Sequence, residues 1–137
     1  MADSVAGIVR RGKDLFIARR GEGGDLGGKW EFPGGKVEEG ESDGEALIRE
    51  FGEEFSAAVT VGPFLGSAVF EHRGAERTLR AYEVRFKKGD FILREHAEWR
   101  WADPEEIKAL DFADSDRKLL DFIGRIAPEG PPSGEIP

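Results

Sequence analysis

A single amphipathic helix lies between two groups of strand-like runs, and it constrains the fold more than any other segment of the chain. Ser42 precedes Glu45 by three residues, a capping box that predicts a helix start. The apolar residues that recur at helical spacing behind this box are Ala46, Leu47, Phe51 and Phe55. We therefore expect a helix over residues 43–55. Its one apolar stripe must be buried against another element, so the neighbouring runs decide the fold class.

The runs on both sides of this helix are rich in β-branched and aromatic residues, which favours strands. They cover residues 4–11, 14–20 and 30–32 before the helix, and 58–72, 78–86 and 91–102 after it. Glycines at 12 and 74 separate neighbouring runs and predict hairpins. A further turn is expected over residues 33–35, because proline lacks a backbone donor and glycine adopts backbone angles closed to other residues.

Further helices are expected near the end of the chain. Asp103 predicts the start of a short helix over residues 104–110, and residues 115–126 predict a longer one. The buried stripe expected on the longer helix comprises Leu119, Leu120, Ile123 and Ile126. Strands around one central helix, followed by helices, predict an α/β (α+β) sandwich with a mixed sheet. We expect one domain over residues 1–127 and a flexible tail over 128–137, where no core-forming pattern exists.

The overall charge narrows the possible partners. The 137 residues include 20 Lys and Arg against 28 Asp and Glu, a net charge of -8. That charge repels phosphate backbones and anionic lipid surfaces, so neither nucleic acid nor a membrane is an expected partner. The absence of cysteine excludes disulfides and thiolate metal sites. The N-terminal segment has no long apolar run, so we expect no signal peptide and predict a cytoplasmic protein.

Three glutamates share one face of the predicted helix. At about 100° per residue, Glu50, Glu53 and Glu54 fall within an arc of roughly 100°. Like charges at such spacings cost an isolated helix a few tenths of a kcal/mol per pair. A solvated acidic face is one interpretation. A metal site is the other, because the turn at Gly35 can expose a carbonyl beside the helix and Mg²⁺ prefers carboxylate, carbonyl and water oxygens.

The spacing around this helix resembles the Nudix box of the Nudix hydrolases. Gly35 is followed after five residues by Glu41, and after seven more by Arg49-Glu50-Phe51-Gly52-Glu53-Glu54. The flanking stretches WEFPGGKVE and REHAEWRWADPEEI resemble the MutT-like nucleoside triphosphate pyrophosphohydrolases. The resemblance covers nearly the whole chain except the tail. It implies the Nudix-type α/β/α sandwich and hydrolysis of a nucleoside diphosphate linked to another group.

Two residues depart from the family pattern. Ser56 stands where the pattern has glycine shortly after the helix, and a left-handed helix cap costs a non-glycine residue on the order of 1 kcal/mol. Phe51 stands where the pattern prefers an aliphatic residue, although it can still fill a core position. Both differences concern the helix exit and its packing rather than the ligands.

The resemblance implies a metal site that would hold Mg²⁺, with Mn²⁺ as a substitute. The metal-binding groups that it implies are Gly35, Glu50, Glu53, Glu54 and a loop carboxylate, for which Glu95 is the candidate and Glu98 the rival. It implies that Arg49 orients these carboxylates, and the residues alone also predict an i,i+4 ion pair with Glu53. The catalytic residues are then expected to be Arg49, Glu50, Glu53 and Glu95.

Glu41 and His96 lie near the expected metal-binding residues. Glu41 belongs to the box, supports the loop or helps to cap the helix, and the sequence leaves these roles open. His96 has no identifiable partner in the sequence. We therefore expect a structural hydrogen-bonding role for it rather than that of a catalytic acid.

Three further residues resemble substrate-binding positions of MutT-like enzymes. Arg20 is the candidate for contacting phosphate, with Arg19 as the alternative. Phe32 either packs against the base or belongs to the core. Asp114 either reads the edge of the base or caps a helix, a position that aspartate fills well.

The expected function is Mg²⁺-dependent hydrolysis of a nucleoside triphosphate, of the oxidised purine or cytidine type, to nucleoside monophosphate and pyrophosphate. The alternative is a Nudix hydrolase of a nucleoside diphosphate sugar or a dinucleoside polyphosphate. A catalytically inactive binding module is disfavoured, because the arginine and glutamates of the box are intact. The expected partner is a small-molecule nucleotide, and the protein is expected to be a monomer or a homodimer.

Overall fold

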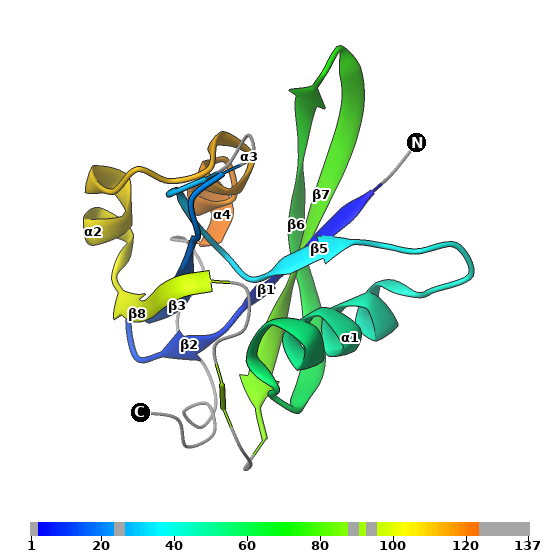
Figure 1. Cartoon of the computed structure of the whole chain (residues 1–137), viewed down its shortest axis with the longest axis horizontal. Coiled ribbons are helices and arrows are strands. Elements are labelled where there is room, and N and C mark those ends of the chain that lie inside the picture. The colour runs from blue at the N-terminus through cyan, green and yellow to red at the C-terminus, as the bar shows by residue number, and fades with distance from the viewer. Residues whose placement is uncertain (1–2, 24–26, 88–90, 93–95, 124–137) are drawn as a thin grey trace.

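The structure is a computed structural model that describes residues 3–23, 27–87, 91–92 and 96–123 (Figure 1). The predicted tail over 128–137 lies outside these residues. None of the described helices is long and apolar enough to span a membrane.

Two four-stranded sheets form the centre of the molecule. The first contains, in spatial order, β5 (Gly34–Lys36), β1 (Ser4–Ile8), β7 (Ala75–Phe86) and β6 (Val59–His72). β1 and β7 are parallel, whereas β5 pairs with β1 and β6 with β7 in antiparallel fashion. The second sheet contains β2 (Arg10–Arg11), β3 (Asp14–Arg20), β4 (Trp30–Glu31) and β8 (His96–Ala102), which pairs with β3. The predicted mixed sheet is therefore confirmed.

Helices lie on both sides of these sheets (Figure 1). They are α1 (Asp43–Phe55), α2 (Pro104–Ala109), α3 (Asp114–Arg117) and α4 (Leu120–Ile123). Successive residues of a strand point to opposite faces, and β1 illustrates this alternation. Val5 packs in a core cluster with Phe51 of α1, whereas Ala6 packs in a second cluster with Ile123 of α4. This arrangement confirms the predicted α/β/α sandwich.

The turn predicted over residues 33–35 is wrong in part, because only Pro33 is a bend and Gly34–Lys36 form the strand β5, which pairs with β1. The strands also differ from the expected runs at two places. The run predicted over residues 4–11 is two strands, because the chain leaves the first sheet after Ile8 and enters the second at Arg10. In the run predicted over 91–102, residues 91 and 92 are outside any strand and β8 covers His96–Ala102, while residues 93–95 lie outside the described residues. Both predicted hairpins are present, and Gly12 and Gly74 take left-handed angles there, with φ of 61° and 78°.

The helix α1 has the predicted bounds of residues 43–55. Ser42 and Glu45 form the expected capping box, with the Glu45 amide donating to Ser42 Oγ at 3.1 Å and the Ser42 amide donating to Glu45 Oε1 at 2.9 Å. Ser56 ends the helix in the left-handed conformation, with φ of 54°. The strained exit expected from the missing glycine is therefore present, and the Ser56 amide donates to the Gly52 carbonyl at 3.0 Å.

The C-terminal helices follow the prediction only in part. Asp103 caps α2 through a second capping box, as expected. The helix predicted over 115–126 is instead the two short helices α3 and α4. Between them the Leu119 amide donates to the Asp116 carbonyl at 3.0 Å, a bond over three residues that tightens the chain into a turn. The stripe residues Leu119, Leu120 and Ile123 are buried as predicted, and Ile126 lies outside the described residues.

Candidate active site

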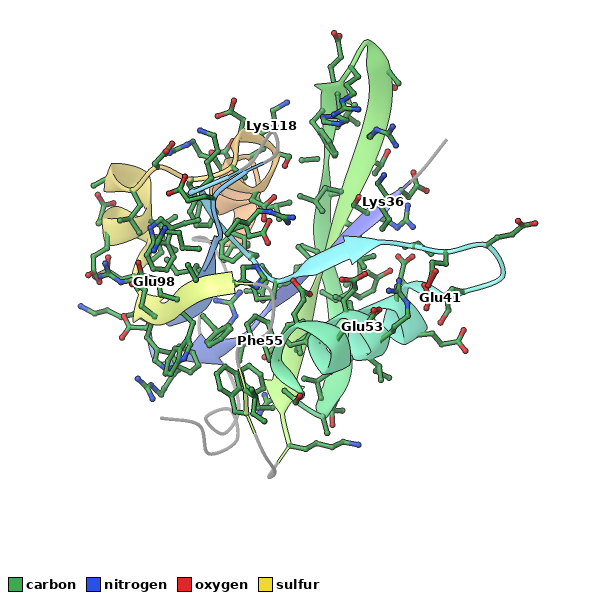
Figure 2. All side chains as sticks on the ribbon, viewed as in Figure 1. Lys36, Glu41, Glu53, Phe55, Glu98 and Lys118 are labelled. Carbon is green, nitrogen blue, oxygen red and sulfur yellow. The ribbon has the colours of Figure 1, made fainter. Side chains whose placement is uncertain are left out.

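Arg49 holds the acidic face of α1 together. Its Nη1 donates to Glu50 Oε1 at 2.7 Å and to Glu53 Oε1 at 2.9 Å, so the predicted i,i+4 pair is present. Its Nε donates to Glu41 Oε2 at 2.8 Å, and its Nη2 donates to the Lys36 carbonyl at 2.9 Å. The guanidinium therefore ties the helix to the preceding loop. Figure 2 shows Glu53 on α1 and Glu41 beside the start of this helix. The cluster of carboxylates raises the pKa of Arg49 above its ordinary value.

Glu41 supports the loop rather than the helix start. Its Oε1 accepts from the Glu38 amide at 2.9 Å and from Arg49 Nη2 at 3.0 Å. The hydrogen bond from Arg49 lowers the pKa of Glu41, so this side chain stays charged at neutral pH. Because Ser42 already fills the cap, the alternative role of Glu41 as a helix cap is wrong.

The carboxylate of Glu50 lies directly against the backbone of Gly35. A β-carbon at position 35 would come within 2.6 Å of Glu50 Cδ and within 2.7 Å of both its oxygens. Real β-carbons do not approach other atoms so closely, and only glycine therefore permits this contact. Burial raises the pKa of Glu50, while the hydrogen bond from Arg49 opposes the shift. Glu54, which is 2% exposed, hydrogen-bonds Glu50, and we call Gly35, Glu50 and Glu54 the cradle because they carry the kind of oxygen atoms that hard divalent cations prefer.

A cavity of about 220 Å³ adjoins this cradle. Gly35 belongs to both, because it touches Glu50 and also lines the cavity. The hairpin of β6 and β7 contributes Phe70 and Leu79 to the apolar part of the wall. The polar part includes Arg20, Glu31 and Asp116. The structure thus brings together an acidic helix face and a half-open pocket of mixed polarity.

Arg20 lines the cavity, whereas Arg19 does not. Nη1 of Arg20 lies 3.4 Å from both carboxylate oxygens of Glu31, at the long end of hydrogen bonding. Arg19 instead pairs with Glu98, with 2.6 Å between Nε and Oε1. Of the two arginines, Arg20 is therefore the one placed to meet a ligand in this cavity.

The pairing of Glu98 also bears on the predicted loop carboxylate. The Glu98 side chain is 51% exposed, and Figure 2 shows it near β8, away from Glu53 on α1. This position disfavours Glu98 as a partner of the acidic face. Glu95, the other candidate, lies outside the described residues.

Phe32 is both a core residue and part of the cavity wall. Its side chain is 2% exposed, and its ring lies edge-on to Phe112 with centroids 5.1 Å apart. Its backbone amide donates to Asp116 Oδ2 at 2.9 Å. The sequence left open whether Phe32 belongs to the core or meets the base, and in this structure the ring packs in the core beside the cavity.

Asp116 is the functional candidate that the sequence analysis missed. Its carboxylate also accepts from Ser115 Oγ at 3.0 Å. Burial, and then the charge of Glu31, raise the pKa of Asp116 to about 7. The sequence does contain a signal for this residue. Position 116 precedes the predicted stripe residues Leu119, Leu120 and Ile123 by three, four and seven positions, so on a helix it would lie on the same buried face. An acid on an apolar stripe is costly to bury, which itself indicates a special role.

Asp114 occupies a different place from the one expected. It is exposed and lines an adjoining hollow with Lys29 and Lys118 instead of the cavity that contains Phe32. Ala113 is the residue at the cap position of α3, and no side chain makes a capping hydrogen bond there. The alternative prediction that Asp114 caps a helix is therefore wrong.

His96 joins two buried carboxylates. Its Nε2 lies 2.8 Å from Glu31 Oε2 and 3.6 Å from Glu54 Oε1. The ligand atoms of these three residues all lie within 4.8 Å of one another. His96 is thus a buried, hydrogen-bonded residue between the cavity wall and α1.

A model of the family described as the NUDIX domain matches residues 1–123. This chain belongs to the Nudix hydrolase family. The Nudix box predicted from the sequence therefore corresponds to α1 and its preceding loop, with Arg49 at the centre of the charge cluster.

Curated relatives place this Nudix protein in the predicted MutT-like branch. It is 37% identical over 121 residues to the CTP pyrophosphohydrolase of Escherichia coli, an alignment covering 88% of this chain and 90% of that protein. It is 36% identical over 124 residues to the putative 8-oxo-dGTP diphosphatase 2 of Mycobacterium tuberculosis, covering 88% and 86% of the two chains. Both relatives are named for activity on nucleoside triphosphates.

Solved structures agree with the Nudix fold. The solution structure of the E. coli ORF135 protein superposes with a TM-score of 0.81 at 36% identity, covering 91% of this chain and 89% of the other. The crystal structure of the MutT protein from Methanosarcina mazei superposes with a TM-score of 0.79 at 28% identity, covering 90% and 93%. The predicted family, branch and fold are therefore confirmed.

Proposed function

We propose that this protein hydrolyses a nucleoside triphosphate, of the cytidine or oxidised purine type, to nucleoside monophosphate and pyrophosphate with the help of Mg²⁺. The observation that carries the proposal is the shared position of Gly35, which touches the Glu50 carboxylate and also lines the half-open cavity. A nucleotide whose base occupies the cavity would therefore extend its phosphates toward the acidic face of α1. The names of the relatives support the same class of reaction.

The proposed metal-binding residues are those of the Nudix box. Gly35 would contribute its carbonyl and Glu50, Glu53 and Glu54 their carboxylates, while Glu95 remains the proposed loop ligand. Bound Mg²⁺ would neutralise charge that develops on the phosphate oxygens and lower the pKa of a bound water. Mn²⁺ would substitute, because it also accepts oxygen ligands.

Arg49 has a positioning role in this proposal. It offsets the repulsion between Glu50 and Glu53, each of which lies within 2.9 Å of one of its nitrogen atoms. It also holds the loop that carries Glu41, so the carboxylates keep their arrangement in the absence of a ligand. Such preorganisation reduces the cost of rearranging the site when substrate arrives.

The proposed base-recognition residue is Asp116, in place of Asp114. An ionised carboxylate only accepts hydrogen bonds and so favours the amino group of cytosine or the N–H groups on the Watson–Crick edge of guanine. When protonated, the same group can also donate. Arg20 is the proposed phosphate contact, because its side chain lines the cavity and is 48% exposed.

The small volume of this half-open cavity supports a compact substrate over the alternative class. Pockets for drug-sized ligands are typically about 300–1,000 Å³, whereas this cavity measures about 220 Å³. One base fits such a space more readily than the second nucleoside of a dinucleoside polyphosphate. We further propose a cytoplasmic protein that acts as a monomer or a homodimer.

A panel of nucleotides tests the proposal. The full chain would be incubated with Mg²⁺ and CTP, dGTP, 8-oxo-dGTP, a nucleoside diphosphate sugar or a dinucleoside polyphosphate, and the products separated by ion-exchange chromatography. We expect nucleoside monophosphate and pyrophosphate in equal amounts from a triphosphate. Orthophosphate as the first product contradicts the proposal, as does turnover of the sugar or dinucleoside substrates alone.

A further inference from the structure

We propose that His96 is a positioning residue that fixes the metal-binding carboxylate of Glu54 and links it to Glu31 in the wall of the cavity. This inference rests on the proposed function, since it takes Glu54 as a metal ligand. According to this inference, His96, which lies outside the Nudix box, contributes part of the metal affinity of the box.

The contacts of a single nitrogen carry the inference. Nε2 of His96 lies 2.8 Å from Glu31 Oε2, a hydrogen bond, and 3.6 Å from Glu54 Oε1. An ionised carboxylate only accepts hydrogen bonds, so Nε2 carries the hydrogen and faces both acids. Glu31 is on β4 and Glu54 on α1, so this one imidazole bridges the second sheet and the helix of the box.

Burial makes this bridge energetically important. The exposed fractions are 7% for Glu31, 2% for Glu54 and 8% for His96. Two carboxylates at such depth lose their hydration, a cost that a buried donor between them offsets in part. Removing the imidazole would remove one of the contacts that hold the Glu54 side chain in place.

Packing fixes the direction in which the imidazole points. The ring stacks on Phe55, with centroids 5.3 Å apart and planes 9° apart. Phe55 in turn stacks on Phe91, with centroids 5.4 Å apart and planes 8° apart. Because Phe55 directly follows Glu54 in α1, the same turn of helix presents the carboxylate and the surface that orients its partner.

The bridge continues into the substrate cavity. Glu31 lines that cavity and lies 3.4 Å from Arg20, the proposed phosphate contact. The contacts therefore run from Arg20 through Glu31 and His96 to Glu54. A substitution at Glu31, which lies on a different element from the Nudix box, should consequently weaken metal binding, and only while His96 is present.

The test is a titration of the full chain with Mn²⁺ alone, followed by electron paramagnetic resonance, without nucleotide. Groups that orient metal ligands typically contribute about 10–100-fold to metal affinity. We expect His96→Phe, which keeps a ring to stack on Phe55, to weaken Mn²⁺ binding by about tenfold or more. We expect His96→Gln, which restores an N–H donor, to recover most of that loss.

Matched variants separate positioning from general stability. Phe91→Leu disturbs the same aromatic stack without touching a carboxylate, so it should lower the melting temperature but leave Mn²⁺ affinity within about twofold. Glu31→Gln should weaken Mn²⁺ binding in the wild type and have no additional effect beside His96→Phe, because the two act through one contact.

If His96→Phe does not fold, His96→Gln and Glu31→Gln carry the test together. Because His96→Gln keeps a donor, Glu31→Gln should then weaken Mn²⁺ binding in the wild type and beside His96→Gln alike, and unchanged affinity in Glu31→Gln would overturn the inference.

Three results would overturn the inference. The first is wild-type Mn²⁺ affinity in His96→Phe, the second is equal losses in His96→Phe and Phe91→Leu, and the third is nitrogen coupling to bound Mn²⁺, which would make His96 a ligand. Glu53→Gln in the same titration distinguishes failure of the proposed function from failure of the inference about His96. Unchanged Mn²⁺ binding in Glu53→Gln would show that the metal site is not on α1, independently of the role of His96.

Discussion

The acidic face of α1 and the cavity beside it use carboxylates under opposite conditions. On α1, Glu53 is 49% exposed on its side chain, and Arg49 lies within hydrogen-bond distance of both Glu53 and Glu50. In the cavity, Asp116 is buried, its hydrogen-bond donors are uncharged groups, and the nearby charge of Glu31 raises its pKa to about 7. The carboxylates of the first set are balanced by the cation of Arg49, whereas the second contains an acid whose charge varies near neutral pH.

From this difference we infer that the acidic face of α1 and the cavity have separate tasks. The acidic face of α1, where Arg49 balances the carboxylates, suits a divalent metal, which prefers carboxylate oxygens. A buried acid whose two protein donors leave it further acceptor capacity suits recognition of a base edge, because mismatched hydrogen bonds are costly there. Substitutions in the first part should slow every substrate equally, and those in the second should change the preference among substrates.

The largest effect is expected from Glu53→Gln. The change keeps the size of the side chain but removes a charge from the proposed metal site, so turnover should fall by about two orders of magnitude or more. The melting temperature should stay level or rise slightly, because repulsion from Glu50 is relieved and the exposed pair with Arg49 contributes little. Steady-state kinetics and thermal melts measure both. Glu39→Gln, an equal charge change on the exposed preceding loop, serves as the control, and near wild-type turnover in Glu53→Gln would remove α1 as the metal site.

A smaller but more local effect is expected from Gly35→Ala. The added β-carbon would meet the Glu50 carboxylate at about 2.6–2.7 Å, so Glu50 must move away from the cradle. We expect a loss of about tenfold or more in kcat/KM and a higher Mg²⁺ concentration for half-maximal rate. Gly44→Ala is the matched control, because its β-carbon meets nothing within 4 Å, and it should stabilise α1 by up to about 1 kcal/mol. Equal kinetics in the two variants would show that the contact between Gly35 and Glu50 has no catalytic consequence.

The next prediction concerns base preference. Asp116→Asn supplies a donor as well as an acceptor at the same size, so it should change the ratio of kcat/KM between CTP and 8-oxo-dGTP by about tenfold. The Mg²⁺ requirement should not move. Asp114→Asn is the control, because Asp114 is exposed and lines the neighbouring hollow instead. A change of ratio in Asp114→Asn but not in Asp116→Asn would restore the residue first expected from the sequence.

The smallest predicted effect is a dependence of stability on pH. The pKa of Asp116 is raised from an ordinary value of 3.8 to about 7, so between these values the folded protein binds one more proton than the unfolded chain. Stability from this group is fully present below about pH 4 and is lost as the pH rises through 7. From pH 5 to pH 8, the free energy of unfolding of Asp116→Asn should improve relative to wild type by about 1–3 kcal/mol. Urea denaturation at the two pH values measures this, and parallel behaviour of the two proteins would place the pKa of Asp116 near its ordinary value.

The sequence predicts the acidic face of α1 well because the interactions of this face are local. The capping box of Ser42 and Glu45 and the pair of Arg49 and Glu53 each join residues three or four positions apart. Helical geometry alone brings such residues together. The exact bounds of α1 follow from the same short-range pattern.

The cavity is less predictable because its contacts join distant parts of the chain. The hydrogen bond between the Phe32 amide and Asp116 spans 84 residues, and that between Glu31 and His96 spans 65. No short-range pattern shows which strand will lie beside which helix. Asp114 was the base-recognition candidate from the sequence because its residue type is plausible. The helical spacing of the buried stripe instead favours Asp116 for this role.

The most direct test of the separation between metal face and base pocket compares Glu53→Gln and Asp116→Asn in one experiment. The quantity measured is the ratio of kcat/KM for CTP to that for 8-oxo-dGTP, at saturating Mg²⁺, in both variants and in the wild type. We predict that Glu53→Gln lowers both constants by one common factor and leaves the ratio unchanged, while Asp116→Asn shifts the ratio by about tenfold. A shifted ratio in Glu53→Gln together with an unchanged ratio in Asp116→Asn would contradict the division of tasks between α1 and the cavity.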